Sequence, residues 1–350
     1  MKTSAAPRSS KRAFTLVEMV AAIAVLTLLL AIILSIVNAA SKVADNAFRS
    51  GDSSEEATQI LDRISADVAG MIIRPDVDQY YVNQAGNDEM FFYSQTPGYF
   101  GTSTAPVTST EQSPVSLIGY RISTTANANL PPMLERLVQG VTWDGQTGTL
   151  PLPFLTFAAP TSVSLAPAAA TGGTIPLAWS AASPDPITDP DTNPDTSASY
   201  WHTVGPQVFR LEICYQLRDG SFTLKPPTPS APPALSTSTT SPVPPVPGSI
   251  NDTTGIVVAI AVLDTKSRQI VPPASWAGLI TALKDPTQTD LGPSPYTVGS
   301  TPPVPILMNT TWNNALQASG FAQSVGIPQM AAAQITVYQR YYPLTAPIAK

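Results

Sequence analysis

The chain has 350 residues, with 18 Lys and Arg, 24 Asp and Glu, 37 Pro, and only one His and one Cys. A single His202 and a single Cys214 exclude a His/Cys zinc site, an iron–sulfur cluster and an internal disulfide, because each needs at least two such residues. The net charge of −6 argues against nucleic acid as a partner, since phosphate binding needs clustered Lys and Arg. With 37 Pro and 20 Gly, we expect one domain with long inserts.

The N-terminal segment has the strongest pattern. Residues 1–13 contain basic but no acidic side chains, and between Phe14 and Ser41 the only charged side chain is Glu18. As a helix, the apolar run Met19–Val37 would be roughly 28 Å long, close to a hydrocarbon core of ~30 Å. The positive-inside rule then places the N-terminus in the cytoplasm and everything after Lys42 across the membrane.

Three interpretations of this segment compete. It could be a secretory signal peptide, cut after Val37-Asn38-Ala39 and before Ala40. It could also be a plain signal anchor for an unrelated domain. The third interpretation depends on Glu18, because an ionised carboxylate costs up to ~3 kcal/mol at the bilayer centre and is usually paired or functional. We therefore expect a partner that neutralises Glu18.

The string KRAFTLVEMV at residues 11–20, followed by the apolar run, resembles the class III signal of type IV pilins and type II secretion pseudopilins. The resemblance implies that a prepilin peptidase cuts between Ala13 and Phe14 and methylates the new Phe14 amine. Ala13 departs from the glycine that usually precedes the cut. The family also implies that Glu18 pairs with the amine of a neighbouring subunit in a filament, which sets the axial register and removes both desolvation costs.

The helix is predicted to continue beyond the membrane. The segment Gly51–Glu56 predicts a break and a restart, with Ser53 and Glu56 (or Asp52 and Glu55) at capping-box spacing. After it, one face is predicted to be apolar and the other polar, and Pro75 is predicted to end the helix. The apolar face comprises Ala57, Ile60, Leu61, Ile64, Val68 and Met71, and the polar face comprises Asp62, Arg63, Ser65 and Asp67.

The remainder is predicted to be β-rich. The alternation from Phe209 to Leu217 predicts a sheet with one buried face, and Asp219-Gly220 predicts a hairpin turn. A short helix is predicted at 313–324. Strands are predicted at 89–94, 115–123, 134–142, 208–217, 222–224, 256–264 and 334–342. Inserts at 97–114, 158–200, 225–248 and 284–305, rich in Pro, Ser and Thr, are predicted to be extended or mobile surface loops.

These elements predict an α+β, pilin-like fold: a long N-terminal helix packed on a mainly antiparallel sheet. The expected parts are a leader (1–13), the transmembrane half of the helix (14–40), its periplasmic half (41–74) and a β-rich domain (75–350). The order of segments is similar to J-type minor pseudopilins, through Leu61–Asp67, Ser116–Ile122 and Leu134–Leu137. The K-type subunit generally lacks the glutamate, so Glu18 argues against it. A J-like subunit would belong to a tip complex with other minor pseudopilins.

Candidate chemistry is sparse, and we expect no enzyme and no cofactor. The sequence has no nucleophile elbow, P-loop or dinucleotide-binding glycine pattern. His202 is expected at a strand start or surface, and Cys214 is expected to be a structural thiol. One acidic loop has oxygen side chains at alternate positions, a weak calcium pattern that lacks the central Gly and the closing Glu. Its members are Asp189, Asp191, Asn193 and Asp195.

The leading hypothesis is a non-enzymatic minor pseudopilin, anchored by one span in a bacterial inner membrane and assembled into a periplasmic filament. Its partners would be the prepilin peptidase and other pilin or pseudopilin subunits. A type IV minor pilin that binds surfaces through its loops is an alternative. Another is a membrane-anchored periplasmic protein of unrelated function, including an enzyme that uses carboxylates such as Glu135 or Glu212 in pairs.

Overall fold

The computed structural model describes residues 15–73, 80–83, 86–99, 112–123, 131–140, 142–143, 154–155, 201–218, 220–224, 253–287 and 308–344. The chain divides into two compact units, Met1–Gly51 and Asp52–Lys350. The described part of the first unit is Thr15 and the first part of helix α1 (Leu16–Ala69), which continues into the second unit.

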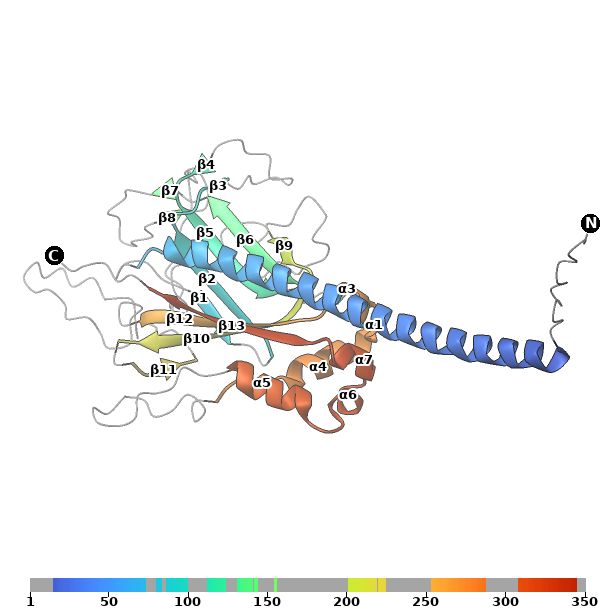
Figure 1. Ribbon diagram of the computed structural model, residues 1–350. Helices are drawn as coiled ribbons and strands as arrows, with labels where there is room; N and C mark the ends of the chain where they lie inside the picture. Colours follow the sequence, from blue (N-terminus) through green and yellow to red (C-terminus); the bar gives the residue numbers. More distant parts are fainter. Residues whose placement is uncertain are drawn as a thin grey trace, which may run out of the picture. The chain divides into compact units, whose positions relative to one another are not determined.

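Helix α1 is continuous through the segment where a break was predicted, so that prediction was wrong (Figure 1). The side chains expected to form a capping box bind another part of the second unit instead. Ser53 Oγ donates to Gln207 Oε1 at 3.0 Å, and the Gln207 backbone N–H donates to Glu56 Oε1 at 2.8 Å. Ser53 and Glu56 therefore bind Gln207 instead of capping a new helix, and α1 continues without a break through Gly51.

The second half of α1 has the predicted apolar face. Ala57, Ile60, Leu61, Ile64 and Val68 are buried. The helix ends at Ala69, before Pro75, which lies outside the described residues.

The chain after α1 turns close to strand β2 (Asp88–Ser94). A side chain at Gly70 would place its Cβ 2.8 Å from Ser94 Oγ, and the Ile72 N–H donates to the Tyr93 carbonyl at 2.8 Å. The helix therefore ends where the chain comes close to β2, before it reaches Pro75.

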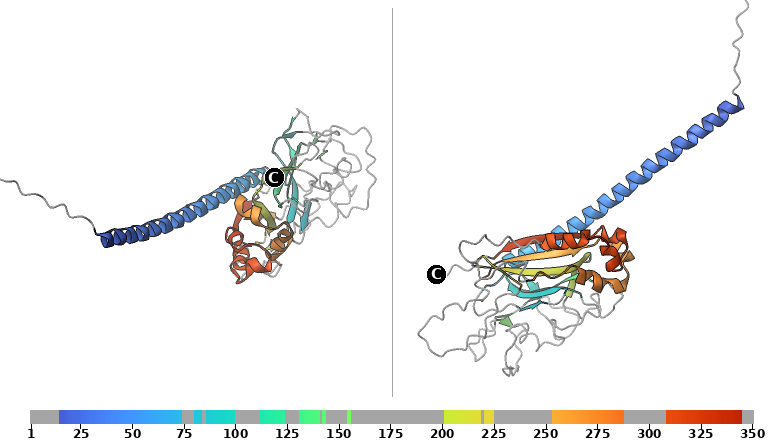
Figure 2. Two further views of the ribbon diagram at one scale, coloured as in Figure 1. Left: turned by 90° about the vertical axis from the view of Figure 1, so that its right-hand side faces the viewer. Right: turned by 90° about the horizontal axis from the view of Figure 1, so that it is seen from below.

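Two antiparallel sheets lie at the centre of the described part of the second unit (Figures 1 and 2). The five-stranded sheet has the order β1 (Tyr80–Asn83), β2 (Asp88–Ser94), β5 (Ser116–Ile122), β6 (Leu134–Gly140), β9 (Trp201–Gly205). The four-stranded sheet has the order β11 (Phe222–Thr223), β10 (Val208–Leu217), β12 (Thr253–Val262), β13 (Thr336–Pro343). Short pairs join β3 (Gly98–Tyr99) with β4 (Gln112–Ser113), and β7 (Thr142–Trp143) with β8 (Phe154–Leu155). The predicted strands match β2, β5, β6, β10, β11, β12 and β13 except at their ends, whereas β1, β3, β4, β8 and β9 were not predicted.

Two apolar clusters make up the core. The first joins the second half of α1 to residues of both sheets. The second joins the opposite face of the four-stranded sheet to a layer of helices, visible as the orange and red ribbons of Figure 2. That layer contains α3 (Thr265–Ile270), the 3₁₀ turn η2 (Pro273–Ser275), α4 (Trp276–Ala282), α5 (Met308–Gln317), α6 (Phe321–Ser324) and α7 (Gln329–Ala332). The α+β class predicted from the sequence is confirmed, and a long apolar helix with antiparallel sheets is consistent with a pilin-like fold.

Strand β10 is buried on both faces, so the prediction of one buried face was wrong. The helix layer covers its second face, which the alternation alone could not reveal. A β-bulge between Val208 and Arg210 also shifts the alternation. Phe209 therefore belongs to the second cluster, whereas Leu211 and Ile213 belong to the first.

Some predicted loops and one predicted helix differ from the structure. The insert at 97–114 contains β3 and β4. In the insert at 284–305, residues 284–287 form no helix or strand, as predicted, although Asp285 binds Arg210, and residues 288–305 lie outside the described residues. The inserts at 158–200 and 225–248 lie outside the described residues. The single helix predicted at 313–324 is two helices, α5 and α6, separated at Gly320, which has a φ of +81°.

Two side chains at and just before the start of β2 bind backbone N–H groups of β10. Among the described residues, β11 pairs with Tyr215 and Gln216 of β10, and these bonds lie on the part of β10 that precedes them. The Leu211 N–H donates to Asn87 Oδ1 at 2.9 Å, and the Ile213 N–H donates to Asp88 Oδ2 at 2.8 Å. These bonds satisfy buried donors and join the two sheets.

A buried ion pair fastens α1 to the five-stranded sheet. Asp67, predicted to face away from the core, is only 1% exposed, so that prediction was wrong. Its carboxylate accepts two bonds from Arg136, both at 2.7 Å, and one from the Tyr120 hydroxyl at 2.5 Å. Burial and the Asp67 charge raise the pKa of Tyr120 well above its usual value, so the hydroxyl stays protonated and donates.

We predict that Asp67→Ala lowers the free energy of unfolding by about 3–5 kcal/mol, because it leaves the Arg136 charge buried without its partner. Asp62→Ala is the matched control on the same helix, since Asp62 pairs with Arg340 but its side chain is 63% exposed. An exposed pair should contribute less than about 1 kcal/mol. Urea unfolding of both variants, followed by circular dichroism, measures the difference; equal losses would contradict the assignment of Asp67 as the anchor.

Candidate functional site

The start of α1 is organised by Thr15 and Glu18. Glu18 Oε2 accepts the Thr15 backbone N–H at 2.9 Å and the Thr15 hydroxyl at 3.0 Å. In return, the Glu18 N–H donates to Thr15 Oγ1 at 3.3 Å. This reciprocal pattern is a capping box, with Thr15 as the N-cap and Glu18 three residues later. The T-x-x-E spacing at residues 15–18 was a sequence signal that could have predicted it, but the reasoning from the sequence missed it.

The capping box holds a negative charge beside the predicted cleavage point. A carboxylate in the first turn interacts favourably with the N-terminal end of the helix dipole. Ala13 and Phe14 lie outside the described residues. Covalent geometry nevertheless limits the separation, since only the Phe14 Cα and carbonyl carbon lie between the Thr15 nitrogen and the Phe14 nitrogen. A cut before Phe14 would therefore create an amine close to the Glu18 carboxylate.

The helix that follows is exposed along its apolar side chains. Large apolar residues from Leu16 to Val37 are 49–80% exposed. In the described part of the chain, α1 is the one helix long and apolar enough to cross a membrane. Within the span, the Thr27 hydroxyl donates to the Ala24 carbonyl at 2.9 Å, so the helix itself satisfies this polar group. Such a surface needs lipid or another apolar partner.

Residues 8–34 match the family model of the prokaryotic N-terminal methylation motif. The N-terminus carries a type IV prepilin-like signal. No curated protein and no solved structure matches the chain. The prepilin-like signal supports the pilin and pseudopilin class and implies processing by a prepilin peptidase and assembly with pilin subunits. Together with the exposed apolar helix, it indicates membrane anchoring.

The other predicted site residues are not brought together. The weak calcium candidates Asp189, Asp191, Asn193 and Asp195 lie outside the described residues. Within the described ranges, no group of three or more His, Cys, Asp or Glu side chains could hold a metal. His202 is exposed on β9, and Cys214 is buried on β10, where burial raises the pKa of the thiol.

The two carboxylates considered for acid–base catalysis are each bound to an arginine inside the core. Glu135 Oε2 accepts from Arg121 Nε at 3.0 Å, and Glu212 Oε2 accepts from Arg210 Nη2 at 2.9 Å. Both glutamates are fully buried. Neither carboxylate lies at a surface where a substrate could reach it, so this geometry offers no support for a paired-carboxylate mechanism.

The surroundings of Glu212 shift its pKa strongly. Burial and the nearby charge of Asp88 raise the pKa of Glu212 to about 9, although Arg210 opposes the shift. Arg210 also bonds Asp285 at 2.5 Å, so one guanidinium binds two carboxylates, and the charge of Asp88 acts on Glu212 as well. Glu212 Oε1 is buried and accepts no hydrogen bond within the described residues. A protonated Glu212 reduces the excess of negative charge in this cluster.

We predict that this group makes the domain less stable as the pH rises from about 4.5 to about 9. In that window the folded state holds a proton on Glu212 that the unfolded chain has released, so the free energy of unfolding falls by up to ~1.4 kcal/mol per pH unit. Glu212→Gln, which imitates the protonated form, should flatten this slope and unfold at higher urea concentration than the native chain at pH 8. Equal pH slopes for the two proteins would contradict the prediction.

Proposed function

We propose that the protein is a non-enzymatic minor pseudopilin of a type II secretion-like system. In this proposal, the peptidase removes residues 1–13 on the cytoplasmic side and methylates Phe14. Before assembly, the processed chain remains in the bacterial inner membrane as a single-pass protein, with its second unit in the periplasm. It is finally extracted into a periplasmic filament through its N-terminal helix. The observation that carries the proposal is the Thr15–Glu18 capping box within the segment that matches the methylation motif.

The capping box supports a role for Glu18 both before and during assembly. Before assembly, the bonds from Thr15 partly compensate the carboxylate for its loss of water. An ionised carboxylate has about four acceptor positions, so Glu18 can keep these bonds and still accept from a cationic amine. In the filament, the amine of a neighbouring Phe14 would neutralise Glu18, and that ion pair would fix the axial position of each subunit.

The J-type assignment is supported by the cluster that anchors α1. The three segments that resemble J-type subunits each contribute one of its members: Asp67, Tyr120 and Arg136. Tyr120 and Arg136 are direct cross-strand partners on β5 and β6. The resemblance therefore follows residues that act together in the core, although they are far apart in the sequence.

The two alternatives differ from the proposal in location and processing. A type IV minor pilin would share the same N-terminus but would be found in filaments sheared from the cell surface. A plain anchored protein would retain Met1, and a secreted protein would begin at Ala40.

We predict that the mature chain begins with N-methyl-Phe14. Intact-mass and N-terminal peptide mass spectrometry of the protein purified from its own membranes would measure this directly. An N-terminus at Met1 or at Ala40 would overturn the proposal, since neither leaves an amine beside Glu18.

We predict that Glu18→Ala reduces incorporation into filaments by at least about tenfold, because removing one member of a buried ion pair costs more than the ~1.4 kcal/mol that a tenfold change represents. The amount of the variant in the membrane should be unchanged. Glu18→Gln is the sharper variant, because its amide oxygen can still accept from Thr15 but carries no charge. If Glu18→Gln assembled as well as the native chain, capping alone would explain Glu18 and the charge pairing would be wrong.

A further inference from the structure

Arg210 of β10 binds the chain segment that follows helix α4. Its side chain is fully buried, and a β-bulge precedes it in the strand. Arg210 Nε donates to the Leu283 carbonyl at 3.1 Å, and Arg210 Nη2 donates to Asp285 Oδ1 at 2.5 Å. We call residues 283–287, which form neither helix nor strand, the α4 tail. One guanidinium therefore holds the α4 tail on both sides of Lys284.

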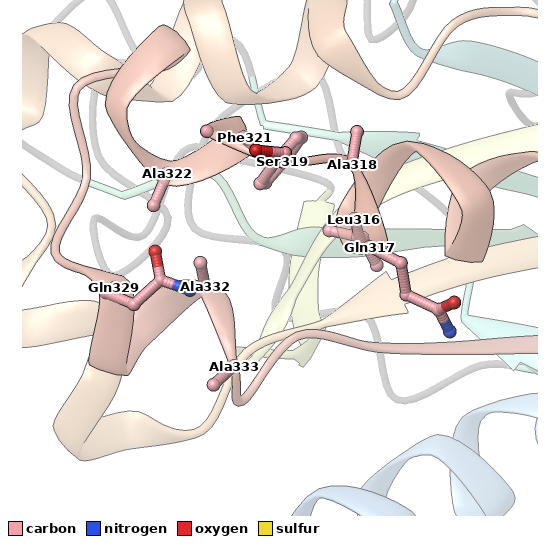
Figure 3. A pocket seen from close by; sticks show the side chains of 10 residues that line it. Leu316, Gln317, Ala318, Ser319, Phe321, Ala322, Gln329, Ala332 and Ala333 are labelled. Atoms are coloured by element: carbon pink, nitrogen blue, oxygen red, sulfur yellow. The ribbon is translucent and has the colours of Figure 1, made fainter.

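Helix α5 is fastened to the same segment. The Trp312 Nε1 donates to the Lys284 carbonyl at 2.9 Å, and the Arg210 guanidinium lies 4.9 Å from the centre of the Trp312 ring. At its C-terminal end, α5 borders a hollow of about 260 Å³, where Leu316 and Gln317 form part of the lining (Figure 3). Side chains that face a void lose packing contacts on that side. The attachment of α5 therefore depends strongly on Trp312 and, through it, on the α4 tail.

The charges around Arg210 are out of balance. Arg210 Nη2 also donates to Glu212 Oε2 at 2.9 Å. The charges of Asp88, at the start of β2, and of Asp285 both act on Glu212. Three ionised carboxylates would place three negative charges beside one positive charge. Burial and the charge of Asp88 raise the pKa of Glu212 to about 9, so a proton on Glu212 reduces this excess at neutral pH.

The elements packed around Glu212 add no counter-charge within the described part of the chain. Strand β12 and helices α4 and α5 contain no Asp, Glu, Lys, Arg or His. Cys214 lies two residues beyond Glu212, on the same face of β10. Its thiol keeps its proton, because burial and the charges of Glu212 and Asp88 raise its pKa. The protonation of Glu212 therefore sets the charge of the buried part of this cluster.

Asp285 is the carboxylate that can leave the cluster. Its side chain is 29% exposed, whereas that of Glu212 is 0% exposed. When Asp285 moves away, a negative charge is removed from beside Glu212, so Glu212 releases its proton more readily. The open form then binds fewer protons than the closed form, and a rise in pH favours it by up to about tenfold per pH unit. This window ends near pH 9, where the closed form loses the same proton.

We infer that the α4 tail is a pH-sensitive latch, which opens locally when Glu212 passes its proton to the solvent and Asp285 moves into water. Arg210 then pairs with Glu212 alone. The opening releases the end of α4 and the bond from Trp312, while both sheets stay folded. It differs from the loss of stability of the whole domain, because only the α4 tail and its contacts change. The latch uses residues of the second unit alone and does not depend on the proposed function.

Trypsin detects the open form, because it can cut after Lys284 only when the bonds on both sides of that residue are released. The full chain, purified in detergent, is digested briefly between pH 6 and pH 9, and the products are identified by mass spectrometry. The cutting rate is divided at each pH by that of an unstructured peptide with the sequence of residues 280–287. The corrected rate at Lys284 should rise at least tenfold from pH 7 to pH 9.

Two outcomes of the digestion would overturn the inference. One is a corrected rate at Lys284 that does not change with pH. The other is cutting at Arg121 and Arg136, inside the five-stranded sheet, as fast as at Lys284, because that pattern shows unfolding of the whole domain.

Three variants separate the proton on Glu212 from general effects of charge. Glu212→Gln has no proton to lose, so its corrected rate at Lys284 should stay low and change less than about twofold over the same pH range. Asp285→Asn weakens the bond to Arg210, so it should be cut faster than the native chain at pH 6 and respond less to pH. Its reference peptide carries the same substitution. Asp62→Asn, which removes an exposed carboxylate elsewhere in the second unit, is the control and should behave like the native chain.

Circular dichroism at pH 6 checks that each variant is folded. A pH response of Glu212→Gln equal to that of the native chain would contradict the latch. If Glu212→Gln does not fold, Asp285→Asn decides: the native rate at pH 6 together with the native pH response would show that Asp285 does not hold the α4 tail.

Discussion

The buried contact between Asp67 and Arg136 decides how the second half of α1 meets the rest of its unit. Two nitrogen–oxygen bonds of 2.7 Å and the Tyr120 hydroxyl fix the helix in rotation and along its axis. The apolar face of the helix, from Ala57 to Val68, is then directed into the cluster that it shares with both sheets. Apolar contacts alone tolerate small slides and rotations, whereas a bidentate pair in the core has one geometry.

Local patterns in the sequence predicted where the helices and strands lie, but not which distant residues pack against them. The strand from Val208 to Leu217 and the long helix follow from period-two alternation and apolar spacing, which depend only on neighbours in the chain. The burial of Asp67, the second covered face of β10 and the continuity of α1 at Ser53 could not be predicted in this way. Each depends on a residue far away in sequence: Arg136, the helix layer, and Gln207.

At the start of α1, the local geometry of the candidate site could be predicted from the sequence, but its proposed partner could not. The capping box of Thr15 and Glu18 is complete within one helical turn, so its spacing is visible in the sequence. In the proposed filament, the partner of Glu18 would be another chain, which neither the sequence nor a single chain contains. The functional part of the site therefore came from a resemblance at residues 11–20, together with the motif matched at 8–34.

The carboxylates at the two ends of α1 are thus bound in different ways. The difference fits a structural role for Asp67 and the proposed assembly role for Glu18. Breaking the Asp67 pair would leave a buried guanidinium and cost about 3–5 kcal/mol, so that contact persists whenever the second unit is folded. The Glu18 bonds are local and exposed, and a single hydrogen bond of this kind contributes about 0.5–1.5 kcal/mol. A carboxylate held so weakly can accept a new cation without unfolding anything. In the proposed assembly, Glu18 can therefore gain a cationic partner, while the Asp67 end keeps the second half of the helix fixed to the sheets.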